Sequence, residues 1–249
     1  MSDTPLTGVR AVVTGAARGL GRAMSLALAG AGAEVVATDV DGDALTETVE
    51  LGRAAPGTVR GMVLDITAEA AVESLATRLW REHGGVDVLF ANAGIVLVRP
   101  SLETTPADLR RVLDVNVVGT FVTARSFGAR MLRQGHGRIV LTASQAGQRG
   151  TPEWLAYCAS KAALISMTQT LSSEWGPAVT VNAIAPGAFV TDLNRHLMAE
   201  PGYLERLRAG TALGRVGHPD DIGPLAVFLA GPGAALMTGG VVNIDGGVR

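Results

Sequence analysis

Two residues with complementary acid–base chemistry, Tyr157 and Lys161, stand four positions apart in a stretch with helical periodicity. Residues spaced i and i+4 lie on one face of a helix, so we expect the phenol and the ammonium to be neighbours. A phenol has a pKa near 10 and is a poor base at neutral pH, but an adjacent positive charge stabilises the phenolate. Lys161 is the only lysine among 21 basic residues, so a chance Tyr-x-x-x-Lys match would be rare. The pair predicts proton transfer; the alternative is an ordinary helix-surface pair.

Ser144 supplies a hydroxyl thirteen residues before Tyr157, directly after an apolar run that predicts a strand. The carboxyl ends of parallel strands carry side chains into the ligand crevice of α/β sheets. Ser144 is therefore a candidate to act beside Tyr157, and the alternative is a turn residue. Cys158 lies about 100° around the helix from Tyr157, which favours packing over catalysis.

The first strand-to-helix turn, Thr14 to Gly21, contains three glycines with the spacing Gly-x-x-x-Gly-x-Gly. A turn without side chains lets backbone N–H groups and the helix N-terminus meet a pyrophosphate. The alternative is an ordinary turn in a chain with 32 glycines. Asp39 ends the second predicted strand, where a carboxylate accepts hydrogen bonds from the adenosine ribose and repels a 2′-phosphate. We therefore expect NAD rather than NADP, although Arg18 could pair with a phosphate and favour NADP.

Short apolar runs alternate with longer segments of helical period, which predicts βαβ units around a parallel sheet buried on both faces. The predicted strands are Arg10–Thr14, Glu34–Asp39, Val59–Leu64, Val86–Ala91, Arg138–Thr142, Val179–Ile184 and Val241–Ile244. The predicted helices are Gly19–Gly30, Gly42–Gly52, Ala68–His83, Pro106–Gln134, Leu155–Trp175 and Asp220–Ala230. Thr67 and Thr105 are expected N-caps. No linker divides the chain, so we expect residues 1–249 to form one domain with a lid at about 188–217.

Composition excludes several classes of function. The chain has 249 residues, 47% hydrophobic and 18% charged, with a net charge of −2, so neither disorder nor nucleic-acid binding is expected. No apolar run is long enough to cross a membrane, and the N-terminus lacks the pattern of a signal peptide. One cysteine and four scattered histidines show no metal-ligand spacing, so we expect no metal. A cytoplasmic protein is expected.

Together these motifs make the chain resemble the short-chain dehydrogenase/reductase family over essentially its whole length. The matching pieces stand in the family's order: Thr14 to Gly21, Asp39, Leu64-Asp65, Ala91 to Gly94, Asn116, Ser144, Tyr157 to Lys161, Asn182, Pro186-Gly187 and Thr191. One departure is Ala91, where the family commonly has an asparagine. The resemblance implies an α/β, Rossmann-like, doubly wound fold, with a mostly seven-stranded parallel sheet in a three-layer αβα arrangement.

The resemblance also implies reversible hydride transfer between an alcohol carbon and a nicotinamide cofactor. The implied catalytic residues are Ser144, Tyr157, Lys161 and Asn116. In this scheme Tyr157 moves the proton and Ser144 hydrogen-bonds the substrate oxygen. Lys161 also holds the nicotinamide ribose, and Asn116 positions a water that links Lys161 to solvent. Asn116 could also be a polar residue that kinks the long predicted helix.

By the same resemblance, the expected cofactor contacts are Gly15, Arg18, Gly19, Leu20, Gly21, Asp39, Asp65, Ile66, Asn92, Ala93, Gly94, Tyr157, Lys161, Pro186, Gly187, Val190 and Thr191. Asp65 and Ile66 are expected at the adenine, although Asp65 could equally cap a helix. The expected substrate contacts are Ser144, Gln145, Gln148, Trp154, Phe189 and Ile95. Trp154 is as readily explained as a packing residue.

The favoured function is an NAD-dependent oxidoreductase acting on a small secondary alcohol or polyol and the corresponding ketone. One alternative is an NADPH-dependent reductase of 3-oxoacyl thioesters, which Arg18 would suit. Another is a non-catalytic nucleotide-binding regulator, which would be expected to lack part of the Ser-Tyr-Lys set. Because the family usually forms tetramers, a homotetramer is expected, with one interface through the helices predicted at 106–134 and 155–175.

Overall fold

The computed structural model describes residues 4–191 and 201–248. Its parallel strands form a seven-stranded sheet in the order β3-β2-β1-β4-β5-β6-β7. The strands are β1 (Arg10–Thr14), β2 (Glu34–Asp39), β3 (Thr58–Val63), β4 (Val88–Ala91), β5 (Gly137–Thr142), β6 (Val179–Pro186) and β7 (Val241–Ile244). The strand order reverses between β1 and β4, so a ligand crevice is expected beyond the carboxyl ends of these strands. The predicted doubly wound sheet is confirmed.

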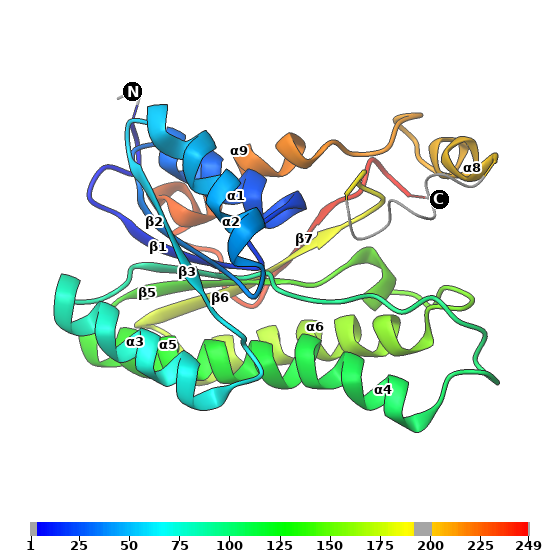
Figure 1. Cartoon of the computed structure of the whole chain (residues 1–249), viewed down its shortest axis with the longest axis horizontal. Helices are drawn as coiled ribbons and strands as arrows, with labels where there is room; N and C mark the ends of the chain where they lie inside the picture. Colours follow the sequence, from blue (N-terminus) through cyan, green and yellow to red (C-terminus); the bar gives the residue numbers. More distant parts are fainter. Residues whose placement is uncertain (1–3, 192–200, 249) are drawn as a thin grey trace.

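Helices cover both faces of this sheet (Figure 1). One face carries α1 (Gly19–Gly30), α2 (Gly42–Leu51) and α9 (Gly223–Ala230). The other carries α3 (Glu69–His83), α4 (Pro106–Leu113), α5 (Thr120–Gln134) and α6 (Leu155–Trp175). The shorter α8 (Tyr203–Ala209) lies at one end of the molecule, away from both helix layers.

Two hydrophobic cores separate along the same faces. Val12 and Val13 are both fully buried in β1, yet Val13 packs into the cluster that contains Met24 of α1, and Val12 into the cluster that contains Phe127 of α5. Successive side chains of a strand point to opposite faces, so a strand covered on both sides must be apolar at every position. This explains why the strands are continuous apolar runs in the sequence.

The long helix predicted over 106–134 is interrupted in the structure. α4 ends at Leu113, a π-helical segment spans Asp114–Gly119, and α5 follows. Asn116 lies in the π-helical segment and turns its side chain inward to bind the backbone of Ile95. A widened turn of this kind marks a place where a side chain leaves the regular helical arrangement to make another contact.

Helix starts agree with the sequence at one predicted cap and differ at two other places. Thr105 caps α4 through a capping box with Asp108. Thr67 does not cap α3; its hydroxyl donates to Asp65, and Ala68 occupies the cap position without a side-chain hydrogen bond. The helix predicted at 220–230 begins as a 3₁₀ turn, Pro219–Ile222, before α9.

The predicted lid at 188–217 is described only in part. Phe189 forms an isolated β-bridge with Gly217, which brings the two ends of this segment together. α8 occupies its second half. Residues 192–200 lie outside the described residues.

Candidate active site

A cavity of about 800 Å³ opens at the carboxyl edge of the sheet. Its wall combines the turn after β1, the segments that follow β2, β4, β5 and β6, the first turns of α6, and α8. The predicted site residues that line it are Gly15, Arg18, Gly19, Leu20, Gly21, Asp39, Asn92, Ala93, Gly94, Ile95, Ser144, Gln145, Trp154, Tyr157, Lys161, Pro186, Gly187, Phe189 and Thr191.

The glycine turn after β1 leaves no room for side chains. Gly15 and Gly19 have φ angles of 66° and 55°, which glycine adopts without strain. A Cβ on Gly15 would lie 2.7 Å from the Cα of Ala93, and a Cβ on Gly21 would overlap the carbonyl oxygen of Gly15. The turn therefore presents backbone to the cavity, as close approach of a pyrophosphate requires.

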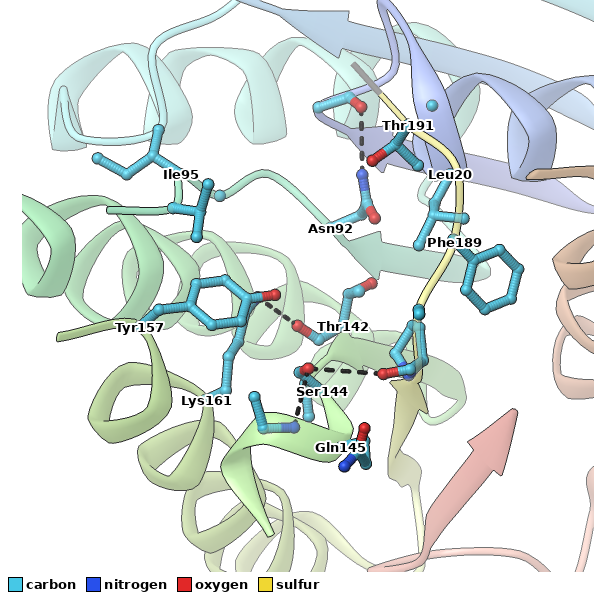
Figure 2. A pocket seen from close by; sticks show the side chains of 18 of the residues that line it. Leu20, Asn92, Ile95, Thr142, Ser144, Gln145, Tyr157, Lys161, Phe189 and Thr191 are labelled. Carbon is cyan, nitrogen blue, oxygen red and sulfur yellow. Dashed lines mark hydrogen bonds between the residues drawn. The ribbon is translucent and has the colours of Figure 1, made fainter. Parts of the chain in front are cut away.

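Asn92 ties this turn to the end of β4. Its Nδ2 donates to the carbonyl oxygens of Thr14 at 3.0 Å and Gly15 at 3.1 Å, and its backbone N donates to the hydroxyl of Thr14 at 3.0 Å. Figure 2 shows the amide turned toward the glycine turn. Asn92 thus fixes the end of β4 against the turn after β1, two segments that are 78 positions apart in the sequence.

Asp39 stands at the end of β2 beside the glycine turn. Its carboxylate accepts hydrogen bonds from the backbone N of Ala17 at 3.0 Å and of Asp41 at 3.1 Å. The guanidinium of Arg18 pairs with the carboxylate of Asp41. Two carboxylates therefore lie at this end of the cavity, and the positive charge of Arg18 is already matched by Asp41.

Tyr157 and Lys161 lie side by side in the cavity, as the i, i+4 spacing predicts (Figure 2). α6 begins at Leu155, so Tyr157 is in its first turn and Lys161 is one turn further along. The Nζ of Lys161 lies 5.6 Å from the centroid of the Tyr157 ring. It donates a hydrogen bond of 2.6 Å to the carbonyl oxygen of Thr142 at the end of β5, which fixes the ammonium beneath the phenol.

Ser144 faces the same part of the cavity from the segment after β5 (Figure 2). Its Oγ accepts from the backbone N of Ala146 at 3.1 Å and lies 3.5 Å from the carbonyl oxygen of Pro186. Thr142 precedes it by two positions, so an extended backbone brings both residues to one face. The hydroxyls of Ser144 and Tyr157 and the ammonium of Lys161 therefore converge, one from the segment after β5 and two from α6.

Burial shifts both titrating groups of the pair toward their neutral forms. It raises the pKa of Tyr157 to about 12, while the Ser144 hydroxyl acts in the opposite direction. It lowers the pKa of Lys161 to about 8, since only 3% of this residue is exposed. Desolvation disfavours the charged form of each group. The protein alone therefore makes Lys161 the more readily titrated of the two.

Asn116 is buried beneath the cavity wall and is not part of its lining. Its Oδ1 accepts from the backbone N of Ile95 at 2.8 Å, and its Nδ2 donates to the carbonyl of Ile95 at 2.9 Å and to Ser160 Oγ at 3.0 Å. A Cβ on Gly94 would lie 3.1 Å from Asn116 Oδ1 and 3.5 Å from Lys161 Nζ. Gly94 therefore keeps the space between Asn116 and Lys161 free of a side chain.

Four further predicted contacts also lie outside the cavity lining. Asp65 accepts hydrogen bonds from the backbone N and hydroxyl of Thr67, which lower the pKa of its carboxyl. Gln148 is exposed and donates to Asn243 Oδ1 at 2.8 Å. Ile66 is buried, and Val190 is 44% exposed.

The sequence interpretation missed several lining residues: Val40, Asp41, Val96, Thr142, Ala143, Ala146, Thr151, Pro152 and Glu153. It named none of Ala188, Tyr203 and Leu207 individually, but all three lie within the predicted lid at 188–217. Thr142 could have been found, because the two-residue period of a strand pairs it with Ser144. Tyr203 and Leu207 come from α8, which lies within the predicted lid, although no local motif singles out these two residues.

Two observations test whether these residues fit a dinucleotide. Gly15, Gly19 and Gly21 line the cavity, and added Cβ atoms at Gly15 and Gly21 would collide with the chain's own backbone, so these positions of the cavity wall carry no side chain. The hydroxyl of Thr142, a residue that is 6% exposed and lines the cavity, has no hydrogen-bond partner among the described residues. Buried polar groups are nearly always paired, so an unpaired one at a cavity is consistent with a bound partner. The residues present fit such a cofactor.

Known proteins resemble the chain along nearly its whole length. A family model described as enoyl-(acyl carrier protein) reductase matches residues 15–249. D-threitol dehydrogenase of Mycolicibacterium smegmatis is 35% identical, covering 98% of this chain and 94% of that protein. NAD-dependent glycerol dehydrogenase of Listeria innocua is 34% identical, covering 98% and 95%.

The chain belongs to the short-chain dehydrogenase/reductase family. A solved structure of another member, described as an NAD(P)-dependent gluconate 5-dehydrogenase from Beutenbergia cavernae with bound NADP, superposes with a TM-score of 0.93 at 38% identity, covering 98% of each chain. This short-chain dehydrogenase/reductase is thus an NAD(P)-dependent oxidoreductase acting on alcohol groups. Among its described helices, none is both long and apolar enough to span a membrane.

Proposed function

We propose that this short-chain dehydrogenase/reductase transfers a hydride reversibly between a small secondary alcohol or polyol and NAD. The observation that carries the proposal is the convergence of Tyr157, Lys161 and Ser144 beside a backbone cradle suited to a pyrophosphate. When bound, a nicotinamide ring supplies the hydride chemistry, so the protein must orient the substrate and move one proton.

Tyr157 is proposed to take the hydroxyl proton of the alcohol as the hydride leaves its carbon, and to return a proton to the oxygen in the reverse direction. Ser144 holds the same substrate oxygen through its hydroxyl. Burial makes the phenolate costly in the protein alone, because it raises the pKa of Tyr157 to about 12. The ammonium of Lys161 is proposed to offset part of this cost, because an opposite charge within several ångströms lowers the pKa of an acid. Lys161 is also proposed to hold the nicotinamide ribose. A positioned proton carrier contributes typically 10²–10⁴-fold to the rate.

Asn116 is proposed to help pass the proton from Lys161 toward solvent. Its Oδ1 and the Lys161 Nζ border the space that Gly94 leaves free of a side chain. A water in that space could accept from the ammonium and donate to a carbonyl-type oxygen, as bridging waters commonly do. Asn116 touches neither the phenol nor the predicted substrate position, so we assign it a positioning role.

The preference for NAD is supported by charge at the end of β2. A 2′-phosphate would meet the carboxylates of Asp39 and Asp41, and Arg18 already pairs with Asp41. Residues Asp65, Ile66 and Val190 remain predicted contacts of the cofactor from positions outside the cavity lining.

Cofactor preference is tested by titrating the protein with NADH and NADPH and following the fluorescence of the reduced nicotinamide. We expect NADH to bind at least about fivefold more tightly, because a like-charge contact costs on the order of 1 kcal/mol or more near a protein surface. Asp39→Ser should narrow the ratio, whereas Asp43→Ser, on the exposed first turn of α2, should not. Tighter binding of NADPH by the unaltered protein would instead support the thioester reductase.

Substrate is proposed to lie against Gln145, Trp154 and Phe189, which line the cavity beyond Ser144. An amide beside aromatic groups suits a small molecule with hydroxyl groups. Two assays separate the two enzymatic functions, and both follow the absorbance of the reduced cofactor. In one, secondary alcohols and polyols are oxidised with the oxidised cofactor. In the other, a 3-oxoacyl thioester is reduced with the reduced cofactor. Turnover of none of them would favour a binding protein.

Assembly into a homotetramer is proposed from apolar side chains left on the surface. Phe121 of α5 and Leu155 of α6 are 39% and 50% exposed, and Leu236 near the C-terminus is fully exposed. We propose that these exposed apolar side chains lie at subunit interfaces, since large apolar side chains on a surface can mark such contacts. Light scattering that gives about four times the chain mass of 25.6 kDa would support this assembly.

A further inference from the structure

Glu153 has an unusual backbone conformation at the wall of the cavity. It is the one non-glycine residue among those described with a positive φ, at 69°. Glycine adopts this conformation freely, whereas a side chain makes it costly. Strained residues of this type persist where the surrounding structure requires them, and they concentrate at binding sites. Glu153 lines the cavity, so its side chain is retained at a position where glycine would be easier.

The strained turn lies next to the reacting group. The carbonyl oxygen of Glu153 accepts a hydrogen bond of 2.7 Å from the backbone N of Arg99, which ties the turn to the segment after β4. The next residue, Trp154, packs edge-on against Tyr157 with ring centroids 5.5 Å apart. Glu153 is therefore one residue away from a ring that contacts the proposed proton carrier.

No cation among the described residues neutralises the carboxylate of Glu153. The nearest guanidinium along this contact, that of Arg99, points elsewhere and pairs with Asp108 at 2.7 Å. The guanidinium of Arg149, four positions before Glu153, lies against the side-chain amide of Gln145. Glu153 itself forms no ion pair or side-chain hydrogen bond within the described part of the chain, and it is exposed.

Among the described lining residues at this end of the cavity Glu153 is the only carboxylate, and Ile95, Gln145, Thr151 and Leu207 are uncharged. The ammonium of Lys161 also lines the cavity, but it is bonded to the carbonyl oxygen of Thr142 and lies beside Tyr157. A carboxylate without a cationic partner makes the potential around it more negative. It accepts hydrogen bonds from hydroxyl groups and repels another carboxylate.

We propose that Glu153 selects the charge class of the substrate, favouring neutral polyols with a hydroxyl remote from the reacting carbon and rejecting the corresponding sugar acids. This rests on the proposed function as an alcohol dehydrogenase. Like-charge repulsion explains the rejection, and hydrogen bonds from the remote hydroxyl to the carboxylate explain the preference. The carboxylate is a specificity-determining group and takes no part in proton transfer.

The test compares two matched pairs, threitol with threonate and galactitol with galactonate, in which a terminal CH₂OH is replaced by a carboxylate. Binding to the NADH-loaded protein is measured by calorimetry, and kcat/KM with NAD is measured separately. The unaltered protein should bind each polyol more tightly than its acid. Glu153→Gln should shrink this preference about fivefold, the effect of one screened charge at several ångströms. High salt should shrink it too.

Two more variants separate charge from backbone. Glu103→Gln removes an exposed carboxylate that lies outside the cavity lining, and it should leave the preference unchanged. Glu153→Gly should raise the Tm by relieving strain and should lose the preference like Glu153→Gln.

The inference is overturned if the acids bind as tightly as the polyols, if neither class binds, or if Glu153→Gln leaves the preference intact. Charge-selective binding without oxidation of any alcohol would overturn the proposed function while leaving the role of Glu153 standing. Oxidation of alcohols without charge-selective binding would support the proposed function and overturn the role of Glu153.

Discussion

Backbone and glycine shape the cavity wall beside β1, whereas side chains from loops and α8 shape it beyond Ser144. The first end is tied together by internal hydrogen bonds, such as those from Asn92 to the glycine turn. The second end includes the segment after β5, the first turns of α6 and the short helix α8. A wall made of backbone suits a ligand part that never changes, while a wall of loop side chains can vary with the substrate. Tyr157 and Lys161 lie where the two ends meet.

Tyr157→Phe should separate the two ends most sharply. We expect alcohol oxidation to fall about 10³-fold, because the proton carrier is lost, while NADH affinity stays within about twofold. Steady-state rates and fluorescence titration measure the two effects. Tyr203→Phe, the same change at the chain's other tyrosine, lines the same cavity and should lose less than about tenfold. Retained activity in Tyr157→Phe would refute the assignment.

Lys161→Arg should affect both ends, because this side chain is proposed both to stabilise the Tyr157 phenolate and to hold the nicotinamide ribose. A guanidinium keeps the charge but cannot fit the 2.6 Å contact with Thr142 in the same way, and it does not release its proton. We expect about a 10²-fold loss of turnover, together with weaker NADH binding. Near wild-type turnover in a correctly folded variant would mean that a lysine is not needed here.

Gly21→Ala should damage the cofactor end specifically. Its Cβ would overlap the Gly15 carbonyl, so the turn must shift at a cost of about 1–3 kcal/mol. NADH affinity should fall about tenfold or more, and the Tm should fall with it. Gly30→Ala, at the other end of α1 with nothing within 4 Å of the added Cβ, is the matched control and should leave both unchanged or raise the Tm slightly. If both variants changed NADH affinity and Tm equally, the close packing of the glycine turn would not explain cofactor binding.

The titration of Lys161 tests how burial shifts the pKa of its ammonium, and it needs no measurement of activity. Because burial lowers the pKa of Lys161 to about 8, its folded-state pKa lies below the ordinary 10.5. The unfolded chain then holds the extra proton between these values, so the free energy of unfolding should rise as the pH increases from 8 to 10.5. Reductive methylation with ¹³C-formaldehyde labels this only lysine and the N-terminus, and the NMR shift should titrate near pH 8. A midpoint near 10.5 would contradict the burial argument.

The cofactor end could largely be predicted from the sequence. Its glycines, Asp39 and the apolar strands around them are local patterns, because a strand, a tight turn and a helix follow one another within about thirty residues. Tyr157 and Lys161 were predictable for the same reason, since their common face depends only on helical geometry. The capping of α4 by Thr105 is another contact within one turn.

Contacts between distant segments could not be predicted in this way at either end of the cavity. The pairing of Arg18 with Asp41 joins residues 23 positions apart on different elements. The inward turn of Asn116 depends on Ile95, and the conformation of Glu153 depends on Arg99. Tyr203 reaches the cavity only because the segment carrying α8 returns to the edge of the sheet.

Local periodicity and steric freedom are properties of neighbouring residues, and for this chain they were enough to specify the sheet, the glycine cradle and the Tyr-Lys pair. The backbone conformation of Glu153, the interrupted helix at Asn116 and the shifted pKa values of Tyr157 and Lys161 accompany burial and contacts between distant segments. Desolvation and long-range hydrogen bonds exist only once the chain has closed around the cavity, so these features depend on the tertiary structure.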